Sequence, residues 1–401
     1  MATDKTHKIP NAPNLRFPEF EGEWKNMRLS EMTRRITRKN SGLISNRPLT
    51  ISAQYGLIDQ RDFFKKAVAS ENIEGYYLLK RGEFAYNKSY SNEHPWGAVK
   101  RLDSYSEGVL STLYICFESM GILSDWMVHY FDSSHWHKQV SEIAVEGARN
   151  HGLLNVSVED FFNTYHYIPK TTIEQKKIAT FLSLIDERIT TQIGAIEAIE
   201  SLITGITSKI SRSNNVKQVY LKDLLTERTE RNVDHHEVYS VSVSEGVVNQ
   251  VEYLGRSFAA ADTSHYCVAR YGDIIYTKSP TGSFPYGIVK RSDISEPVAV
   301  SPLYGVYRPL NDNIGIYLHQ YFCSAINAHN YLHKLIQKGA KNTINITNQR
   351  FLQNTIPIPD EVTLEKYVRV IDALVQKLKN EKFLLESYRQ QKVYLLKNMF
   401  V

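Results

Sequence analysis

The chain has 401 residues, of which 42% are hydrophobic and 23% are charged, and its formal net charge is +5 at pH 7. This length suffices for two or three domains, each large enough to bury an ordinary core. The three cysteines, Cys116, Cys267 and Cys323, are too few and too scattered for a disulfide framework or a zinc site, which indicates a reducing compartment. No apolar run reaches the roughly 18 residues of a membrane span, and the first residues lack the apolar core of a signal peptide, so we expect a cytoplasmic protein.

Residues 1–168 are predicted to form a mixed domain of short strands and helices. Runs of β-branched and aromatic residues between glycines indicate strands at 82–86 and 110–117. Residues 126–131 and 158–162 are typical of short helices.

A cluster of cations near the start of this domain favours a polyanionic partner. Seven basic residues accompany the single acid Glu31 there. The 25 tyrosines of the chain add only weak support, because tyrosine is also a common sheet residue. The seven cations are Lys25, Arg28, Arg34, Arg35, Arg38, Lys39 and Arg47.

Residues 172–210 carry one apolar stripe at steps of three and four, with no proline inside, which predicts a long coiled-coil-like helix. The short polar stretch 211–215 that follows is typical of a linker. The stripe consists of Ile178, Leu182, Ile185, Ile189, Ile193, Ile196, Ile199, Ile203, Ile206 and Ile210.

Residues 217–360 predict a second mixed domain, with strand candidates at 238–243, 273–276 and 298–307. The last segment, 361–401, carries a second apolar stripe, which Lys382 and Lys392 interrupt. Its members are Leu364, Val368, Ile371, Val375, Leu378, Leu385, Tyr388, Leu395 and Met399.

Two stripes of equal length predict that the two helices pack against each other, antiparallel because the intervening domain returns the chain. The alternative is that each helix lies on its own domain. The predicted boundaries are 1–170 for the first domain, 171–212 for the first helix, 213–360 for the second domain and 361–401 for the second helix. The residues predicted to line the interface between the helices are Ile178, Leu182, Ile185, Ile189, Ile371, Val375 and Leu378.

The two domains repeat the same pattern. Residues 76–101 align without a gap on 266–291, and ten residues recur 190 positions later. A period this long excludes a solenoid, whose units have 20–50 residues, so each repeat is a whole domain with its helix. The recurring residues are Tyr76, Gly82, Tyr86, Lys88, Ser89, Pro95, Gly97, Val99, Lys100 and Arg101.

No enzyme motif is recognisable in the sequence. Residues 147–152 have the glycine spacing of a phosphate loop, but Leu153 stands where the lysine is required. No motif for binding a methyl donor is evident. The His135–His137 and His235–His236 pairs lack Cys or carboxylate partners at ligand spacing, so we expect surface or hydrogen-bonded histidines. The pattern favours a binding protein rather than a catalyst.

The repeated core Gly-[Glu/Asp]-x-x-Tyr-x-Lys-Ser, at 82–89 and 272–279, belongs to a larger pattern. Gly-Ala-Arg/Lys-Asn follows at 147–150 and 339–342, and Ile-Pro precedes each long helix, at Ile168 and Ile358. Over nearly its whole length the chain resembles the specificity subunit of type I restriction–modification systems.

The resemblance implies an α+β protein with two mixed α/β target recognition domains and two long helices packed as an antiparallel coiled coil. Each domain would recognise one half of a bipartite sequence in double-stranded DNA. The helices would set the spacer and dock two modification subunits, which restriction subunits join. The chain itself would be non-catalytic and without cofactor: the modification subunit binds S-adenosylmethionine and methylates adenine N6, and the restriction subunit uses ATP and Mg.

DNA contacts are expected from both repeats. Phosphates should be bound by positions that the halves share, and bases by positions where they differ. The alternative for the Lys-Arg pairs is that they are solvated strand ends. The phosphate-binding candidates are Lys88, Lys100, Arg101, Arg149, Lys278, Lys290, Arg291 and Lys341. The base-reading candidates are Asn87 against Thr277, Tyr90 against Pro280 and Asn92 against Gly282. The set of expected DNA contacts also includes Tyr86, Ser89, Asn150, Tyr276, Ser279 and Asn342.

Two other classes of protein remain open at this point. A coiled-coil scaffold would explain the helices but not the basic, tyrosine-rich domains, and it would not bind DNA alongside a methyltransferase subunit. A fused methyltransferase–specificity enzyme would need several hundred more residues with donor motifs, and would transfer methyl groups alone.

Overall fold

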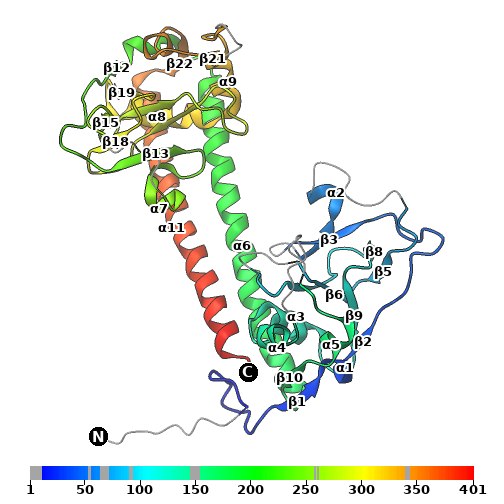
Figure 1. Ribbon diagram of the computed structural model, residues 1–401. Coiled ribbons are helices and arrows are strands. Elements are labelled where there is room, and N and C mark those ends of the chain that lie inside the picture. Colours follow the sequence, from blue (N-terminus) through cyan, green and yellow to red (C-terminus); the bar gives the residue numbers. More distant parts are fainter. Residues whose placement is uncertain are drawn as a thin grey trace, which may run out of the picture. The chain divides into compact units, whose positions relative to one another are not determined.

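The computed structural model describes residues 11–52, 56–63, 72–89, 94–144, 154–256, 259, 262–338 and 344–401. The chain divides into two compact units, Met1–Gln192 with Leu384–Val401, and Ile193–Phe383. Each unit holds one half of the duplication and part of both long helices, α6 (Thr172–Ser211) and α11 (Glu361–Asn398) (Figure 1).

The first unit combines short strands with short helices. The strands are β1 (Lys25–Arg28), β2 (Thr33–Arg35), β3 (Leu49–Ser52), β4 (Gly56–Asp59), β5 (Tyr77–Lys80), β6 (Phe84–Asn87), β7 (Ala98–Arg101), β8 (Glu107–Leu110), β9 (Ile115–Ser119) and β10 (Tyr165–Ile168). The helices before α6 are α1 (Leu29–Met32), α2 (Gln60–Phe63), α3 (Ser124–Asp132), α4 (His137–Ile143) and α5 (Val158–Phe162). An antiparallel sheet has the order β2-β9-β6-β7, and β1-β10, β3-β4 and β5-β8 form pairs.

The second unit repeats this arrangement. Its strands are β11 (Val216–Tyr220), β12 (Leu225–Glu227), β13 (Val238–Ser242), β14 (Gly246–Asn249), β15 (Cys267–Ala269), β16 (Ile274–Thr277), β17 (Ile288–Arg291), β18 (Val298–Val300), β19 (Gly305–Pro309), β20 (Gln337–Lys338), β21 (Ile344–Asn345) and β22 (Thr355–Pro359). Its helices before α11 are a 3-10 turn at Leu221–Asp223, α7 (Gln250–Leu254), α8 (Asp312–Cys323), α9 (Ala325–His333) and α10 (Asn348–Phe351). The sheet β12-β19-β16-β17 has the order of β2-β9-β6-β7, and a second sheet has the order β14-β13-β18-β15.

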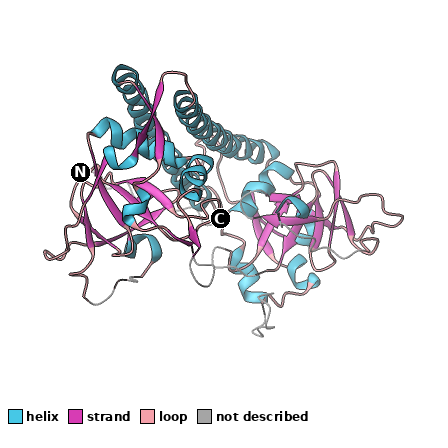
Figure 2. Cartoon of the chain, turned by 90° about the horizontal axis from the view of Figure 1, so that it is seen from above, coloured by secondary structure: helices cyan, strands magenta, loops and turns pink. Residues whose placement is uncertain are grey.

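The duplication extends to strand register. Phe84 of β6 is paired with Phe117 of β9, and Ile274 of β16 is paired with Tyr307 of β19. Both partners shift by 190 positions, so the gapless alignment of the sequence is also an alignment of the hydrogen-bonded ladders. The strands of each unit lie together, with short helices beside them (Figure 2).

Two predicted strands are each divided in the structure. Residues 110–117 contribute to β8 and then β9, and 298–307 to β18 and then β19. Turns separate the pieces: Tyr114 N–H donates to the Ser111 carbonyl, and Tyr304 N–H donates to the Ser301 carbonyl. The two pieces join different sheets, so the prediction of one continuous strand was wrong in both halves.

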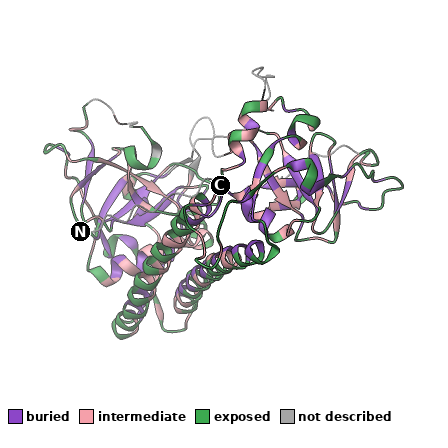
Figure 3. Ribbon diagram, turned by 90° about the horizontal axis from the view of Figure 1, so that it is seen from below, coloured by how far each residue is buried: buried purple, intermediate pink, exposed green. Residues whose placement is uncertain are grey.

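Each unit has a large aromatic core beneath its main sheet. In the first unit Trp126, Trp136 and Phe161 are buried, and in the second Tyr317 and Phe351 are. The strands are largely buried, whereas the long helices are exposed along much of their length (Figure 3).

The long helices run antiparallel within each unit. In the first unit, Lys392 of α11 is 2.6 Å from Asp186 of α6. In the second unit, Lys382 is 2.8 Å from Glu200, and the Tyr367 hydroxyl is 2.8 Å from Thr207 Oγ1. Residue numbers fall along α11 as they rise along α6, which is the antiparallel order.

The alternative of helices lying on their own domains also holds in part. The start of α6 shares one buried cluster with Trp126 and with the end of α11. The start of α11 shares another with Tyr276 and with the end of α6. Each helix therefore packs on its own domain and on the other helix. Among the described residues, no helix is both long and apolar enough to cross a membrane.

Candidate nucleic-acid interface

The loops that join β6 to β7 (88–97) and β16 to β17 (278–287) are attached to the core of their units in the same way. The Tyr86 hydroxyl donates to the Trp96 carbonyl over 2.8 Å, and the Tyr276 hydroxyl donates to the Tyr286 carbonyl over 2.8 Å. Tyr86 also stacks on Phe161, with ring centroids 4.6 Å apart. Burial raises the pKa of both phenols. Both tyrosines therefore fix the loop ends from inside the core.

The last residue of each loop is a glycine that packs directly on the end of the preceding strand, β6 or β16. A Cβ at Gly97 would lie 2.2 Å from the Asn87 carbonyl oxygen, and one at Gly287 would lie 1.9 Å from the Thr277 carbonyl oxygen. Gly97 and Gly287 also have φ of +80° and +104°. Only glycine fits this close approach, so it closes both loops in the same way.

We expect Gly287→Ala to lower the free energy of unfolding by at least about 3 kcal/mol, because strain at positive φ and a backbone clash add together. Gly272→Ala is the matched control: Gly272 also has positive φ, but its added Cβ would come no closer than 3.7 Å to a neighbour. For the control we expect a loss of about 1–2 kcal/mol. Urea unfolding of both variants checks this, and equal losses would contradict the close approach.

Glu83 and its equivalent Asp273 hold the turn before strands β6 and β16. Arg38 binds Glu83 through Nη2 at 2.7 Å, and Arg228 binds Asp273 through Nε at 2.6 Å. Each carboxylate also accepts a backbone N–H, from Lys80 at 2.7 Å in the first unit and from Arg270 at 2.8 Å in the second.

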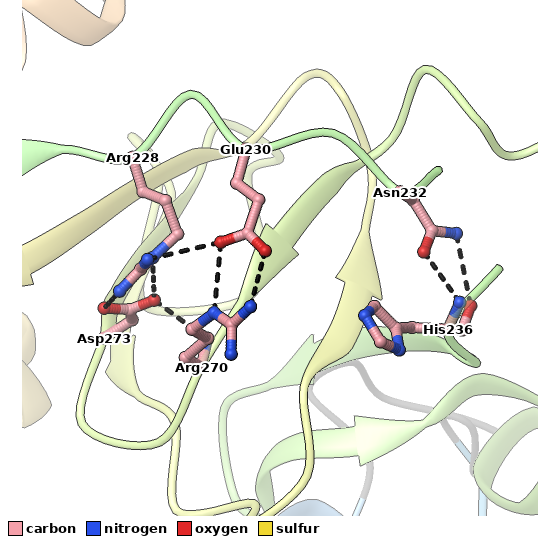
Figure 4. Close-up of polar contacts among 6 residues, drawn as sticks. All are labelled: Arg228, Glu230, Asn232, His236, Arg270 and Asp273. Atoms are coloured by element: carbon pink, nitrogen blue, oxygen red, sulfur yellow. Dashed lines mark hydrogen bonds and ion pairs between the residues drawn. The ribbon is translucent and has the colours of Figure 1, made fainter. Parts of the chain in front are cut away.

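Glu230 extends the second of these networks. It bridges Arg228 and Arg270, and all three lie together with Asp273 in Figure 4. Asn232 in the same view exchanges two hydrogen bonds with the His236 backbone, at 2.7 and 3.2 Å. These polar groups satisfy one another, so their role is to shape the turn.

The first loop is hydrogen-bonded to residues 154–156. Leu154 N–H donates to the Lys88 carbonyl over 2.9 Å, and Lys88 Nζ is 3.2 Å from the Val156 carbonyl oxygen. Lys88 is half-buried, Ser89 is exposed, and Asn87 accepts the Ser89 N–H. The predicted contacts Tyr90, Asn92, Arg149 and Asn150 lie outside the described residues.

The second loop ends in an exposed turn. Thr281 and Phe284 exchange backbone hydrogen bonds of 3.1 and 2.8 Å, and Phe284 is buried beneath them. The residues between them, Gly282 and Ser283, are exposed, as are Ser279 and Pro280.

The other predicted contacts of the second half differ in exposure. Thr277 is buried, with 2% exposed. Lys278 is half-buried, and burial lowers its pKa more than the charge of Glu227 raises it. Lys341 and Asn342 lie outside the described residues.

The predicted phosphate contacts Lys100 and Arg101 are engaged in ion pairs. Lys100 Nζ is 2.6 Å from Asp132, and Arg101 is 2.7 Å from Asp103 and 2.6 Å from Asp125. Burial raises the pKa of Asp132, but Lys100 and Lys392 outweigh it and leave that pKa below its ordinary value.

Lys290 and Arg291, the equivalent pair of the second unit, are both buried, and each is 6% exposed. Arg291 binds Asp293, and binds Asp312 at 2.5 Å. Its guanidinium lies 4.7 Å from the Tyr271 ring centroid. Both Lys-Arg pairs link a strand to a helix of the same unit, and their predicted roles as phosphate contacts or strand ends stay predictions.

The surroundings of these arginines are acidic. The charged lining of a cavity of about 260 Å³ in the second unit comprises the carboxylates Asp293, Asp312 and Asp372 and the cations Arg291 and Lys379. A more open one in the first unit, of about 870 Å³, is lined by Arg101, Asp103, Asp125 and Asp186. Carboxylates outnumber the lysines and arginines in both cavities, so neither favours a phosphate of the DNA backbone.

Most of the seven clustered cations also have internal partners. Arg34 binds Glu118, Arg38 binds Glu83, and Arg47 lies 4.2 Å from the Tyr105 ring centroid. Arg28 bonds to the Tyr165 hydroxyl, and Lys39 lies over the Tyr77 ring. The basic cluster is therefore less available to a polyanion than its sequence indicates.

An aromatic–histidine cluster beside the second loop was missed. His329 and His333 of α9 stack with ring centroids 5.4 Å apart, and Tyr286 at the loop end lies 5.1 Å from His329. Both histidines are exposed. The i, i+4 spacing of the histidines was the available signal. Among the described residues, no group of three or more His, Cys, Asp or Glu side chains could hold a metal ion.

The seven residues predicted to line the helix interface lie in two separate cores. Ile178, Leu182 and Ile185 are buried, and Ile189 is packed against them, in the cluster that contains the end of α11. Ile371 is buried, with Val375 and Leu378 packed against it, in the cluster that contains the end of α6.

No family model matches the sequence, and no curated protein does. Among solved structures, the chain is similar to the Type-I restriction-modification system S subunit from M. genitalium. The TM-score is 0.58 at 12% identity, covering 97% of this chain and 99% of that one. It is also similar to a chain from a structure on complex assembly and conformational transition of the type I R-M system, with a TM-score of 0.53 at 13% identity, covering 94% and 97%.

These similarities show the fold of a type I S subunit over nearly the whole chain. The predicted fold class, two mixed domains with two long antiparallel helices, is confirmed.

Proposed function

We propose that this chain is the DNA sequence-specificity subunit of a type I restriction–modification complex. It is a cytoplasmic, non-catalytic protein, and each of its two domains recognises one half of a bipartite target in double-stranded DNA. Its long helices set the spacer and dock two modification subunits. Those subunits bind S-adenosylmethionine and methylate adenine N6, and the restriction subunits use ATP and Mg.

The observation that carries this proposal is a pair of loops that are attached to the core in the same way but differ in sequence. Tyr86 and Tyr276 hold both loops by the same hydrogen bond, while the sequence changes from Asn-Lys-Ser-Tyr at 87–90 to Thr-Lys-Ser-Pro at 277–280. The shared attachment of the loop to the core fixes where the loop meets the duplex. The variable residues of the loop select the base pairs.

The buried residues leave the set of proposed DNA contacts. Tyr86, Tyr276 and Thr277 are core residues, and the two Lys-Arg pairs bind carboxylates or lie inside the fold. The described candidates that stay are Asn87, Lys88, Ser89, Lys278 and Ser279, and we add the exposed turn at 281–283 with His329 and His333. Tyr90, Asn92, Arg149, Asn150, Lys341 and Asn342 stay as sequence predictions.

We expect Lys88→Ala and Lys278→Ala to weaken DNA binding by similar amounts, because the two lysines hold the same place in each repeat. Each substitution should lower the slope of log affinity against log salt by about 0.9, the value of one phosphate contact. The measurement is DNA binding over a salt series by the complex with its modification subunits.

Lys209→Ala is the control, because it removes the same charge from an exposed position of α6. Its salt slope should stay unchanged. An altered methylated sequence with intact affinity in either loop variant would contradict the assignment of these lysines to the DNA backbone.

A further inference from the structure

The second unit buries Lys290 without the carboxylate partner that the equivalent lysine has in the first unit. Lys100 and Lys290 are equivalent, and Lys100 Nζ is paired with Asp132 at 2.6 Å. In α8 the offset between the halves is 191 positions, because the Tyr317–Tyr321 ring stack repeats the Trp126–Tyr130 stack, so no carboxylate stands in the place of Asp132. A buried ammonium needs an opposite charge nearby, so the partner of Lys290 must come from another residue.

That partner is Cys323, the last residue of α8. Lys290 Nζ lies 3.4 Å from Cys323 Sγ. Cys323 takes the place of Asp132, the last residue of α3, and a serine follows the helix in both units, Ser133 in the first and Ser324 in the second. The exchange of Asp132 for Cys323 therefore moves the negative charge that faces the lysine from a carboxylate to a sulfur.

His319 supplies a second donor to the same sulfur. Its Nδ1 accepts the Arg291 N–H at 3.0 Å, so in the neutral ring Nε2 carries the proton. Nε2 lies 3.7 Å from Cys323 Sγ, within reach of a hydrogen bond to sulfur. The histidine is thus oriented to donate to the charged sulfur.

The third element near the sulfur is α11, through Tyr367. Burial raises the pKa of this phenol, and it is hydrogen-bonded to Thr207, so it stays uncharged. Burial also raises the pKa of Cys323, but His319 and Lys290 outweigh it and lower that pKa to about 7. By contrast, burial raises the pKa of Cys116 to about 12 and also raises that of Cys267.

We propose that Cys323 is a reactive thiolate, held by Lys290 and His319, and is a site of covalent modification by small electrophiles. Cys323 is partly exposed, unlike Cys116 and Cys267. With an alkyl halide, the sulfur lone pair forms a bond to carbon, the carbon–halogen bond breaks and halide leaves. The product thioether is neutral, so modification removes the counter-charge of Lys290. The proposal does not depend on the DNA-binding function.

Two measurements on the full chain test the proposal. Thiolate absorbance at 240 nm, titrated against pH, should show one transition near pH 7 that disappears in Cys323→Ser. Iodoacetamide at pH 7 should label Cys323 at least about tenfold faster than Cys116 and Cys267, because an ordinary thiol of pKa ~8.5 is only a few per cent ionised there. A transition at pH 8.5 or above, or equal labelling of the three cysteines, would overturn the proposal.

Two variants separate the parts of the site. Lys290→Gln should move the transition upward by at least one pH unit and slow labelling at pH 7 about tenfold, since its charge is lost. His319→Gln keeps an amide donor and should move the transition less. If Lys290→Gln does not fold, the titration of the unsubstituted chain and of His319→Gln still decides. A transition unchanged in both variants would show that neither residue holds the thiolate.

Discussion

Replacing residues 216–359 with the corresponding domain of another S subunit should change one half of the methylated sequence completely. The other half and the spacer should stay as they are. The exchanged piece begins at β11 and ends at β22, and these strands pair with each other, with Val216 opposite Pro359. Both ends of the module therefore lie side by side, outside the long helices, and the exchange leaves α6 and α11 intact.

The donor domain must also fit the helices. Ile199 and Ile203 of α6 and Leu364 and Tyr367 of α11 share the core of the second unit. A donor with similar apolar residues at the facing positions avoids cavities, which would cost about 2–5 kcal/mol for each large side chain lost. The measurement is the N6-methyladenine map of cells that express the hybrid. Changes in both halves of the sequence would show that the domains do not act independently.

Lengthening both helices by one heptad should lengthen the non-specific spacer between two unchanged half-sites. Duplicating 186–192 in α6 and 384–390 in α11 keeps each apolar stripe in phase, because seven residues return the same face to the partner helix. Seven residues add about 10 Å at 1.5 Å each, which is at most about three base pairs of 3.4 Å.

The insertion has to be made in both helices. Asp186 contacts Lys392 in the first unit, and Glu200 contacts Lys382 in the second. An insertion in α6 alone would lie between these contacts and shift one set by about 10 Å against an unchanged α11. We therefore expect the single insertion, or a two-residue insertion that rotates the stripe by roughly 200°, to prevent assembly with the modification subunits. An active paired-insertion complex that methylates sites with the original spacer would contradict this role of the helices.

The periodic features of the sequence predicted the fold well. The isoleucine stripe from Ile178 to Ile210 indicated α6, because steps of three and four residues survive whatever the helix packs against. The 190-residue repeat predicted two domains of one topology, since equal patterns of apolar residues give equal strand registers. The turns at Ser111 and Ser301 were missed. In the first half the turn contains short polar residues but no glycine, so the strand-like residues on either side of it look like one continuous strand in the sequence.

The contact residues were harder to predict, for a definite reason. Residues shared by both halves were interpreted as phosphate contacts, but a repeated fold also repeats its own internal contacts. Tyr86 and Arg101 recur as Tyr276 and Arg291 because they hold the loops and helices. The partners that show this, such as Trp96 for Tyr86 and Asp125 for Arg101, lie on other elements and follow no periodic pattern that would pair them from the sequence alone.

The most direct test of the central claim is a map of N6-methyladenine in cells that express this chain with its modification subunits. We expect one bipartite motif, with two specific half-sites separated by a non-specific spacer of fixed length, which disappears when this chain alone is deleted. Methylation that persists without the chain, or an uninterrupted motif, would contradict the assignment of this protein as a specificity subunit with two recognition domains.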